Sequence, residues 1–244
     1  MRLLSNRILH TANKSARLVV CLACAIMAAP AAITGCAALQ GSLGVNPLEI
    51  LMREPGKWAL ILLLAALAIA PLRHLLMMLA QRRHWEYGKR LPDWNWLMRL
   101  RRPVGLACFF YAAVHLALYL SLDLNFSWHE FTGDLRDKPY IVIGWMAFLL
   151  LLPLAVTSTN AWMRRLKRNW KRLHLLIYPV AVLAEIHFLL LSKPGVTDPL
   201  PFGWVLIGLL GYRIMQRRPS GATSQERADG TAPERPIRQD AHKS

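Results

Sequence analysis

The sequence has few acidic residues, few charged residues of any kind and no long polar stretch in which a soluble domain could fold. Only 14 of its 244 residues are Asp or Glu, and charged residues make up 18% of the chain, compared with roughly 25% in soluble domains. Hydrophobic residues make up 55%, and the mean hydropathy is +0.28. This composition excludes a soluble enzyme with appended nucleotide-binding domains, because too little chain remains between the apolar runs.

The 30 Lys and Arg residues give a formal net charge of +16, which in a soluble protein would suggest a nucleic-acid partner. Here the positive residues form clusters that separate long apolar runs, so we expect no nucleic-acid partner. The pattern is typical of an integral membrane protein.

Six segments are candidates for membrane-spanning helices, which need about 20 mostly apolar residues. They are Leu18–Leu39, Trp58–Leu79, Val104–Leu122, Tyr140–Thr159, His174–Leu191 and the shorter Pro201–Met215. The predicted fold is an all-α integral membrane six-helix bundle.

The positive residues mark every second connection between these segments. Lys and Arg are concentrated in the N-terminal arm, after the second and fourth segments and after the sixth. The positive-inside rule therefore predicts that both termini are cytoplasmic and that the loops 40–57, 123–139 and 192–200 face outward. The second outward loop is acidic, with Asp123, Glu130, Asp134 and Asp137.

The chain accordingly divides into three parts. We expect a basic cytoplasmic arm at 1–17, a six-helix transmembrane domain at 18–215 and a disordered cytoplasmic tail at 216–244, which is too polar to pack. The four cysteines indicate no site, since the Cys21 and Cys24 pair lies within an apolar run without a second such pair.

Two histidines lie at matched depth within the apolar segments. At 1.5 Å per residue, His115 is about 20 Å beyond Arg102 and His187 is about 22 Å beyond Arg172. Intramembrane ionisable residues are costly and usually functional. Two imidazoles on neighbouring helices are what a six-coordinate haem requires. The alternative is that each histidine only forms a hydrogen bond between helices.

His174 lies near the cytoplasmic boundary, and its role is open. On a straight helix it would point about 140° away from His187, although Pro179 between them could kink the helix. A second haem at His174 would need His74 as its partner, but their depths match poorly. The alternatives are a hydrogen bond to a haem propionate, a contact to a quinone or flavin, and an ordinary interfacial histidine.

Several spaced motifs resemble a known family. They are Arg101-Arg102-Pro103-Val104-Gly105-Leu106, Tyr111-Ala112 with His115, Lys138-Pro139-Tyr140-Ile141, Leu154-Ala155-Val156-Thr157-Ser158, and Arg164-Arg165-Leu166 with Trp170, Leu173-His174, Tyr178, Leu183-Ala184 and His187-Phe188. The chain closely resembles the MsrQ (YedZ) family over roughly residues 18 to 215. These are haem-binding membrane subunits of the periplasmic protein-methionine-sulfoxide reductase system, in the ferric-reductase-like transmembrane superfamily.

The resemblance implies an inner-membrane cytochrome b with one haem b or two, and it associates FMN with the family. Such a subunit passes electrons from the quinol pool or a reduced flavin to a periplasmic molybdopterin-containing partner, which reduces methionine sulfoxide in damaged proteins. His115, His187 and His174 match the haem-associated histidines. The chain itself would be an electron-transfer subunit without catalytic residues of its own.

Two residues depart from the family pattern: His74, and Glu185, for which we favour a local pairing over a proton site. Thr157 and Ser158 could contact a flavin or quinone, although such hydroxyls more often bond to their own helix. Two other functions stay open. One is a ferric-reductase-type cytochrome with its FAD and NAD(P)H domains on another polypeptide, and the other is a cofactor-free scaffold or transporter.

Overall fold

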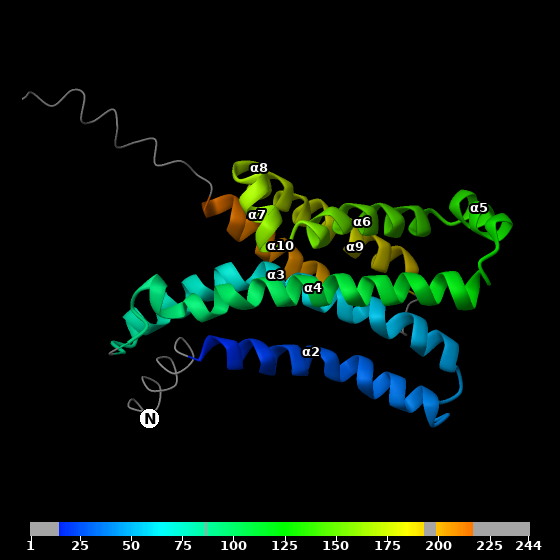
Figure 1. The fold of residues 1–244 in the computed structure, drawn as a ribbon, viewed down its shortest axis with the longest axis horizontal. Helices are drawn as coiled ribbons and strands as arrows, with labels where there is room; N and C mark the ends of the chain where they lie inside the picture. The colour runs from blue at the N-terminus through cyan, green and yellow to red at the C-terminus, as the bar shows by residue number, and fades with distance from the viewer. Residues whose placement is uncertain (1–14, 86, 193–198, 217–244) are drawn as a thin grey trace, which may run out of the picture.

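The computed structural model describes residues 15–85, 87–192 and 199–216, and these residues form helices and short connections without a strand (Figure 1). Most of the expected basic arm at 1–17 and of the expected tail at 216–244 lies outside the described residues. Gln216 is an exception, since it is the last residue of a helix.

Six long helices run back and forth along a common direction (Figure 1). They are α2 (Ala16–Leu39), α3 (Pro47–Arg82), α4 (Asn95–Leu118), α6 (Pro139–Val156), α9 (Ile177–Leu191) and α10 (Leu200–Gln216). Among the described residues, five helical stretches are long and apolar enough to cross a membrane. α10 has 17 residues, so the sixth crossing stays a prediction. The chain is a multi-pass membrane protein.

Helix α3 begins at Pro47 rather than at Trp58, and most of the predicted outward loop 40–57 is therefore helical. Proline at the first helical position suits a helix start, because its missing N–H has no partner there in any case. The added turns are polar and carry an ion pair between Arg53 and Glu49 at 3.1 Å. A search for apolar runs misses such turns. They bring α3 to the level of His115, whose Nδ1 lies 2.7 Å from the Met52 carbonyl oxygen.

Three short helices occupy the connections that the sequence analysis expected to be loops. They are α5 (Trp128–Asp137), α7 (Asn160–Leu166) and α8 (Arg168–Leu173). The side chains of Ser127 and Thr159 cap α5 and α7 by accepting hydrogen bonds from the backbone N–H groups of Glu130 and Trp162.

The fifth predicted segment is divided near its start. His174 lies in a short 3-10 helix, η3 (His174–Leu176), and α9 begins only at Ile177. Pro179 therefore lies in the first turn of α9, where proline is tolerated, and produces no kink within the helix. The straight-helix angle between His174 and His187 does not apply, because the chain changes helix type between them.

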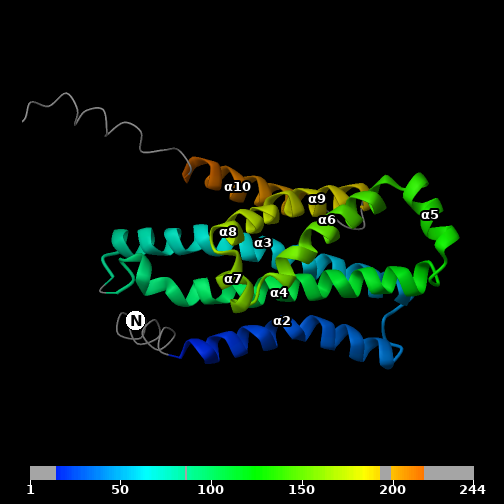
Figure 2. The same ribbon diagram turned by 45° about the horizontal axis from the view of Figure 1, so that its top comes forward.

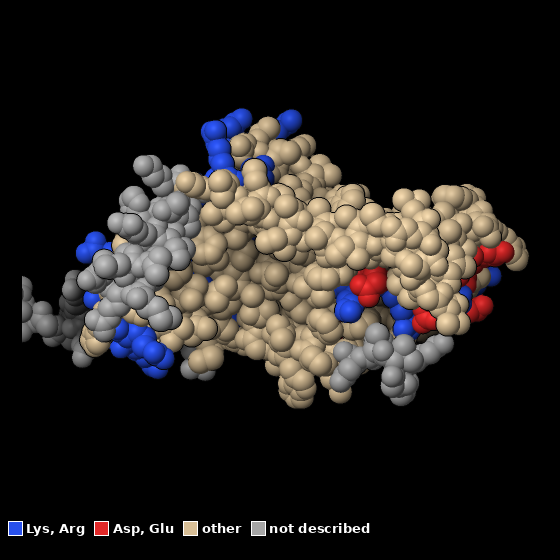
Figure 3. Space-filling view, turned by 90° about the horizontal axis from the view of Figure 1, so that it is seen from below, with Lys and Arg blue, Asp and Glu red and all other residues tan. Residues whose placement is uncertain are grey.

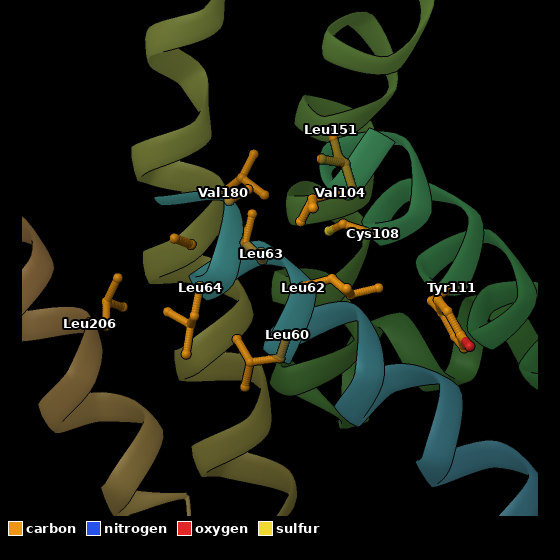
Figure 4. Close-up of a cluster of buried hydrophobic side chains, with 12 residues drawn as sticks. Leu60, Leu62, Leu63, Leu64, Val104, Cys108, Tyr111, Leu151, Val180 and Leu206 are labelled. Carbon is orange, nitrogen blue, oxygen red and sulfur yellow. The ribbon is translucent and has the colours of Figure 1, made fainter. Parts of the chain in front are cut away.

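The core lies where α3 meets α4, α9 and α10 (Figure 4). Four leucines and an alanine of α3 pack there against residues of α4, α6, α9 and α10: Leu60, Leu62, Leu63, Leu64, Ala66, Val104, Cys108, Tyr111, Leu151, Val180, Ala181 and Leu206. Interdigitation at small residues such as Ala181 suits a membrane, where close packing rather than escape from water holds helices together.

Helix α2 lies at the edge of the bundle (Figure 2), and none of its most apolar stretch is buried. One contact fixes it to α4. The buried Tyr111 hydroxyl donates to the Met27 carbonyl at 2.7 Å and accepts from the Ala31 N–H at 3.1 Å. It thus stands between a carbonyl and the N–H four residues later, a pair that an uninterrupted helix would join directly.

Acidic groups gather toward one end of the bundle, whereas basic groups lie at both ends (Figure 3). We call the end with the α3–α4 connection and α7–α8 the basic end, and the end with α5 the acidic end. The acidic groups visible in Figure 3 all lie toward the acidic end. This distribution agrees with the alternating charge pattern of the sequence.

Candidate functional site

His115 of α4 and His187 of α9 face each other within the bundle, toward its acidic end. Their ring centroids are 6.2 Å apart and their planes make an angle of 74°. Both side chains are partly buried. The structure therefore brings together the two histidines that the depth argument had paired.

Each of these rings is held by a backbone carbonyl of a neighbouring helix. His115 Nδ1 lies 2.7 Å from the Met52 carbonyl oxygen of α3, and His187 Nδ1 lies 2.6 Å from that of Tyr140 in α6. A carbonyl oxygen only accepts, so both Nδ1 atoms carry the proton. In a neutral imidazole this leaves a lone pair on Nε2, the arrangement found in metal-ligating histidines.

A glycine lies beside each ring, four residues after the carbonyl that holds it. A Cβ atom added at Gly56 would be 3.1 Å from His115 Nδ1, and one added at Gly144 would be 2.8 Å from both Nδ1 and Cε1 of His187. The two sites are built alike, with a carbonyl at one position and a glycine one helical turn later. Only a residue without Cβ lets these backbones approach the rings so closely.

The paired histidines fit an iron bound between them. An imidazole nitrogen binds a metal ion at roughly 2.0–2.1 Å, so two rings on opposite sides of one iron have centroids roughly 6 Å apart. The observed 6.2 Å agrees with this separation. Among the described residues no group of three or more His, Cys, Asp or Glu could hold a bare metal ion. The two histidines supply one nitrogen on each side of such an iron, as a six-coordinate haem requires.

His174 lies apart from this pair. Its ring stacks on Trp170 with centroids 4.0 Å apart, and its Nδ1 lies 3.1 Å from the Trp170 carbonyl oxygen. The Trp170 indole in turn donates to the Thr157 carbonyl at 3.0 Å, which joins α8 to the end of α6. His74 packs edge-on against Tyr212, with centroids 6.4 Å apart. The ring contacts of these two histidines are thus with aromatic residues.

The remaining candidates make few contacts beyond their own helices. The hydroxyls of Thr157 and Ser158 both donate at 2.6 Å to carbonyls four residues earlier, as expected for hydroxyls within helices. Glu185 packs beside Gly203 of α10. Its Oε2 is buried without a hydrogen-bond partner among the described residues, so the expected local pairing is not found there.

A hydrogen bond joins α5 to the end of α4, and an ion pair at the end of α5 accompanies it. Asp134 accepts from the Tyr119 hydroxyl at 2.8 Å and lies 2.7 Å from Lys138 Nζ. Burial raises the pKa of Asp134, but the hydrogen bonds from Lys138 and Tyr119 outweigh it and hold that pKa below its usual value. The hydrogen bond with Asp134 in turn raises the pKa of Lys138. The two side chains are thus held in their charged forms.

The carbonyls and glycines of the site were not identified from the sequence. Met52 and Gly56 lie in the polar start of α3, which was expected to be a loop, and Gly144 lies within a long apolar run. An isolated glycine within a helical pattern often has a packing reason. That signal marks Gly144, but it does not say what approaches it.

The helical bundle and its paired intramembrane histidines define a multi-pass membrane protein of the ferric-reductase-like class. The family described as "Ferric reductase like transmembrane component" matches residues 55–184, which contain α4, α6 and most of α3 and α9. Both glycine positions and His115 fall within this match, and His187 lies just beyond it.

Three relatives show which family within this class the chain belongs to. The "Protein-methionine-sulfoxide reductase heme-binding subunit MsrQ" of Xanthomonas axonopodis pv. citri is 43% identical over 187 residues, which are 77% of this chain and 78% of the relative. The protein of the same name from Xanthomonas campestris pv. campestris is 46% identical over 180 residues, 73% and 75% of the two chains. That from Rhodospirillum rubrum is 39% identical over 218 residues, 88% and 96% of the two chains. The chain belongs to the MsrQ family.

Proposed function

We propose that this chain binds haem b through His115 and His187 and serves as the electron-transferring membrane subunit of a protein-methionine-sulfoxide reductase. The observation that carries the proposal is the pair of facing imidazoles, each with Nδ1 on a carbonyl and with centroids 6.2 Å apart. The names of the relatives, which describe haem-binding subunits, support it.

The residues around the site fix the two ligands. The carbonyls of Met52 and Tyr140 hold Nδ1–H on each ring, so that Nε2 is the atom that binds the iron. Gly56 and Gly144 provide the space in which the rings lie against α3 and α6. A haem held by both histidines would supply an iron that exchanges single electrons rather than binding oxygen.

The proposed direction of transfer follows the charge pattern. With the basic end cytoplasmic, the histidine pair lies toward the outer face of the bacterial inner membrane. Electrons would come from the quinol pool or a reduced flavin such as FMN at the cytoplasmic side. They would pass to a periplasmic molybdopterin-containing subunit that reduces methionine sulfoxide. Reduction of the substrate takes place on that partner, so no catalytic residue is assigned to this chain.

A haem titration of the purified full-length protein tests the proposal. We expect a Soret band in the wild type and loss of this haem in His115→Ala and His187→Ala. His129→Ala, on helix α5, is the matched control and retains it. Wild-type haem content in both ligand variants would overturn the proposal.

Reconstitution with a periplasmic methionine-sulfoxide reductase subunit tests the electron acceptor. When quinol or reduced flavin is supplied, we expect the partner subunit to reduce methionine sulfoxide. We expect no reduction of ferric chelates. Ferric reduction without sulfoxide reduction would favour the ferric-reductase alternative.

A further inference from the structure

A small cavity with two arginines lies among four helices near the basic end. It has a volume of about 20 Å³ and is bounded by α3, α4, α9 and α10. It is lined by Arg213 of α10 and the exposed Arg101 of α4, by Tyr178 and Tyr212, and by Ala66 and Ala70 of α3. No acidic residue lines it.

The positive charge in this cavity has no counter-charge. Arg213 Nε is buried and has no hydrogen-bond partner among the described residues. None of the three ion pairs found in that part of the chain includes Arg101 or Arg213. Arg101 lies near enough to His174 for an electrostatic interaction, but both groups of that pair are basic.

Another arginine at the same end shows how such a group is ordinarily satisfied. Arg73 of α3 donates from Nε and Nη2 to the Leu91 carbonyl at 3.0 and 2.7 Å, and from Nη2 to the Asn95 side chain at 2.9 Å. A buried guanidinium atom without such partners is costly, and more so where lipid rather than water surrounds the protein. A hydrogen-bond acceptor at Arg213 Nε would remove this cost.

We propose that Arg101 and Arg213 bind the phosphate group of an anionic membrane phospholipid. The planar fork of a guanidinium group matches the oxygens of a phosphate, as it does those of a carboxylate. The cavity has room for about one water-sized group, which suits a phosphate oxygen with the rest of the ligand outside. Leu67, Leu209 and Leu210 also line the cavity, so the surroundings of the charge are apolar, as the chains of a lipid require.

The position of the two arginines supports a lipid headgroup. Arg213 is in the last turn of α10, and Arg101 is in the first third of α4, so both lie near the basic end of the bundle. Basic pockets between transmembrane helices at such an end bind lipid headgroups. The Tyr212 hydroxyl accepts from Gln216 Nε2 at 2.6 Å, which leaves its own proton to donate to the phosphate.

The test uses the full-length protein, delipidated in neutral detergent and then placed in phosphatidylcholine nanodiscs with or without phosphatidylglycerol. Native mass spectrometry measures which lipid stays bound. We expect phosphatidylglycerol to be retained selectively, and Arg101→Gln and Arg213→Gln each to weaken its retention by about fivefold. Arg99→Gln, at an arginine two residues away on α4 that is exposed like Arg101 but does not line the cavity, is the matched control and retains it.

Three results would overturn the proposal: equal retention of both lipids, an equal loss in Arg99→Gln, or complete displacement of the lipid by inorganic phosphate, which would indicate a soluble phosphate ligand. The Soret band is recorded in the same samples and is expected to be unchanged in all three variants. Because lipid retention does not depend on haem, failure of this proposal is distinguishable from failure of the proposed function.

Discussion

His115 and His187, which lie on helices α4 and α9, present their rings to each other across 6.2 Å with planes crossed at 74°. The angle is set by the carbonyls of Met52 and Tyr140, which hold the two Nδ1 atoms from different helices. Ring orientation at this site is therefore a property of the bundle and not of the histidines themselves.

The crossed planes predict a spectroscopic signature of the bound haem. Crossed axial imidazoles interact with different iron d orbitals and leave them nearly equal in energy, whereas parallel imidazoles separate them. We expect a highly anisotropic low-spin ferric EPR signal with a large maximal g value. The signal should persist in His174→Ala, because His174 lies apart from the pair. A rhombic signal typical of parallel planes would contradict the observed ring orientation.

Gly144→Ala tests the close approach of α6 to His187. The added methyl group would lie 2.8 Å from two ring atoms, so the ring must shift away from its position. Overpacking of this kind costs on the order of 1–3 kcal/mol, and we expect haem affinity to fall by about tenfold. Haem retention during purification and titration measures the effect.

Gly105→Ala is the control for this change, because a Cβ atom at Gly105 meets nothing within 4 Å. It should keep wild-type affinity. Gly56→Ala should have a smaller effect than Gly144→Ala, since its nearest ring atom is 3.1 Å away. Equal behaviour of all three variants would show that the glycines do not limit the histidine rings.

Tyr111→Phe tests the attachment of α2. The variant removes the hydroxyl that joins the Met27 carbonyl and the Ala31 N–H to α4. Interhelical hydrogen bonds in membranes contribute roughly 0.6 kcal/mol on average and up to about 1.7 kcal/mol, and the loss should lie within that range because Met27 and Ala31 can then bond to each other. Equilibrium unfolding in mixed micelles measures it.

Faster amide hydrogen exchange confined to α2 should accompany the Tyr111→Phe loss, since little else buries that helix. Phe110→Leu, at an exposed position of α4, is the control and should leave exchange in α2 unchanged. Faster exchange throughout the bundle would show instead that Tyr111 stabilises the whole core.

The Asp134–Lys138 pair predicts that stability at the acidic end of the bundle depends on pH. The pKa of Asp134 is lowered in the folded protein, so its contribution to stability is present above its unfolded pKa and is lost as pH falls through the folded value. The pKa of Lys138 is raised, so its contribution is lost only in strong alkali. We therefore expect the pair to stabilise α5 at neutral pH and to fail in acid.

Asp134→Asn provides the measurement for this pH dependence. The difference in melting temperature between the wild type and Asp134→Asn should be largest near neutral pH and should shrink as the pH falls below the folded pKa of Asp134. Asp137→Asn, on the same helix and outside the ion pair, is the control and should show no such trend. A difference that is constant with pH would indicate that the carboxylate charge is unimportant.

The sequence by itself determined the class of protein, the approximate position of its helices and the pairing of His115 with His187. Apolar runs and the alternation of basic clusters are local properties of the chain. Because the thickness of the membrane is fixed, they give the depth of each residue in it. Two residues at matched depth on helices of the same direction could therefore be paired without coordinates.

The polar elements could not be placed in this way. The first turns of α3, and the helices α5, α7 and α8, contain too few apolar residues to stand out as membrane segments, and capping by Ser127 and Thr159 decides where two of them begin. His174 was assigned to a continuous helix, whereas the chain forms a 3-10 turn there.

Only the tertiary structure decided what surrounds the histidines. The carbonyls that hold them lie 63 and 47 residues away in the chain, and the contacts of Tyr111 with α2 span 80 and 84 residues. Such contacts depend on how each helix is rotated about its axis and how closely it approaches its neighbour. The spacing of residues along the chain predicts their depth in the membrane. It predicts neither the rotation of a helix about its axis nor the distance between two helices.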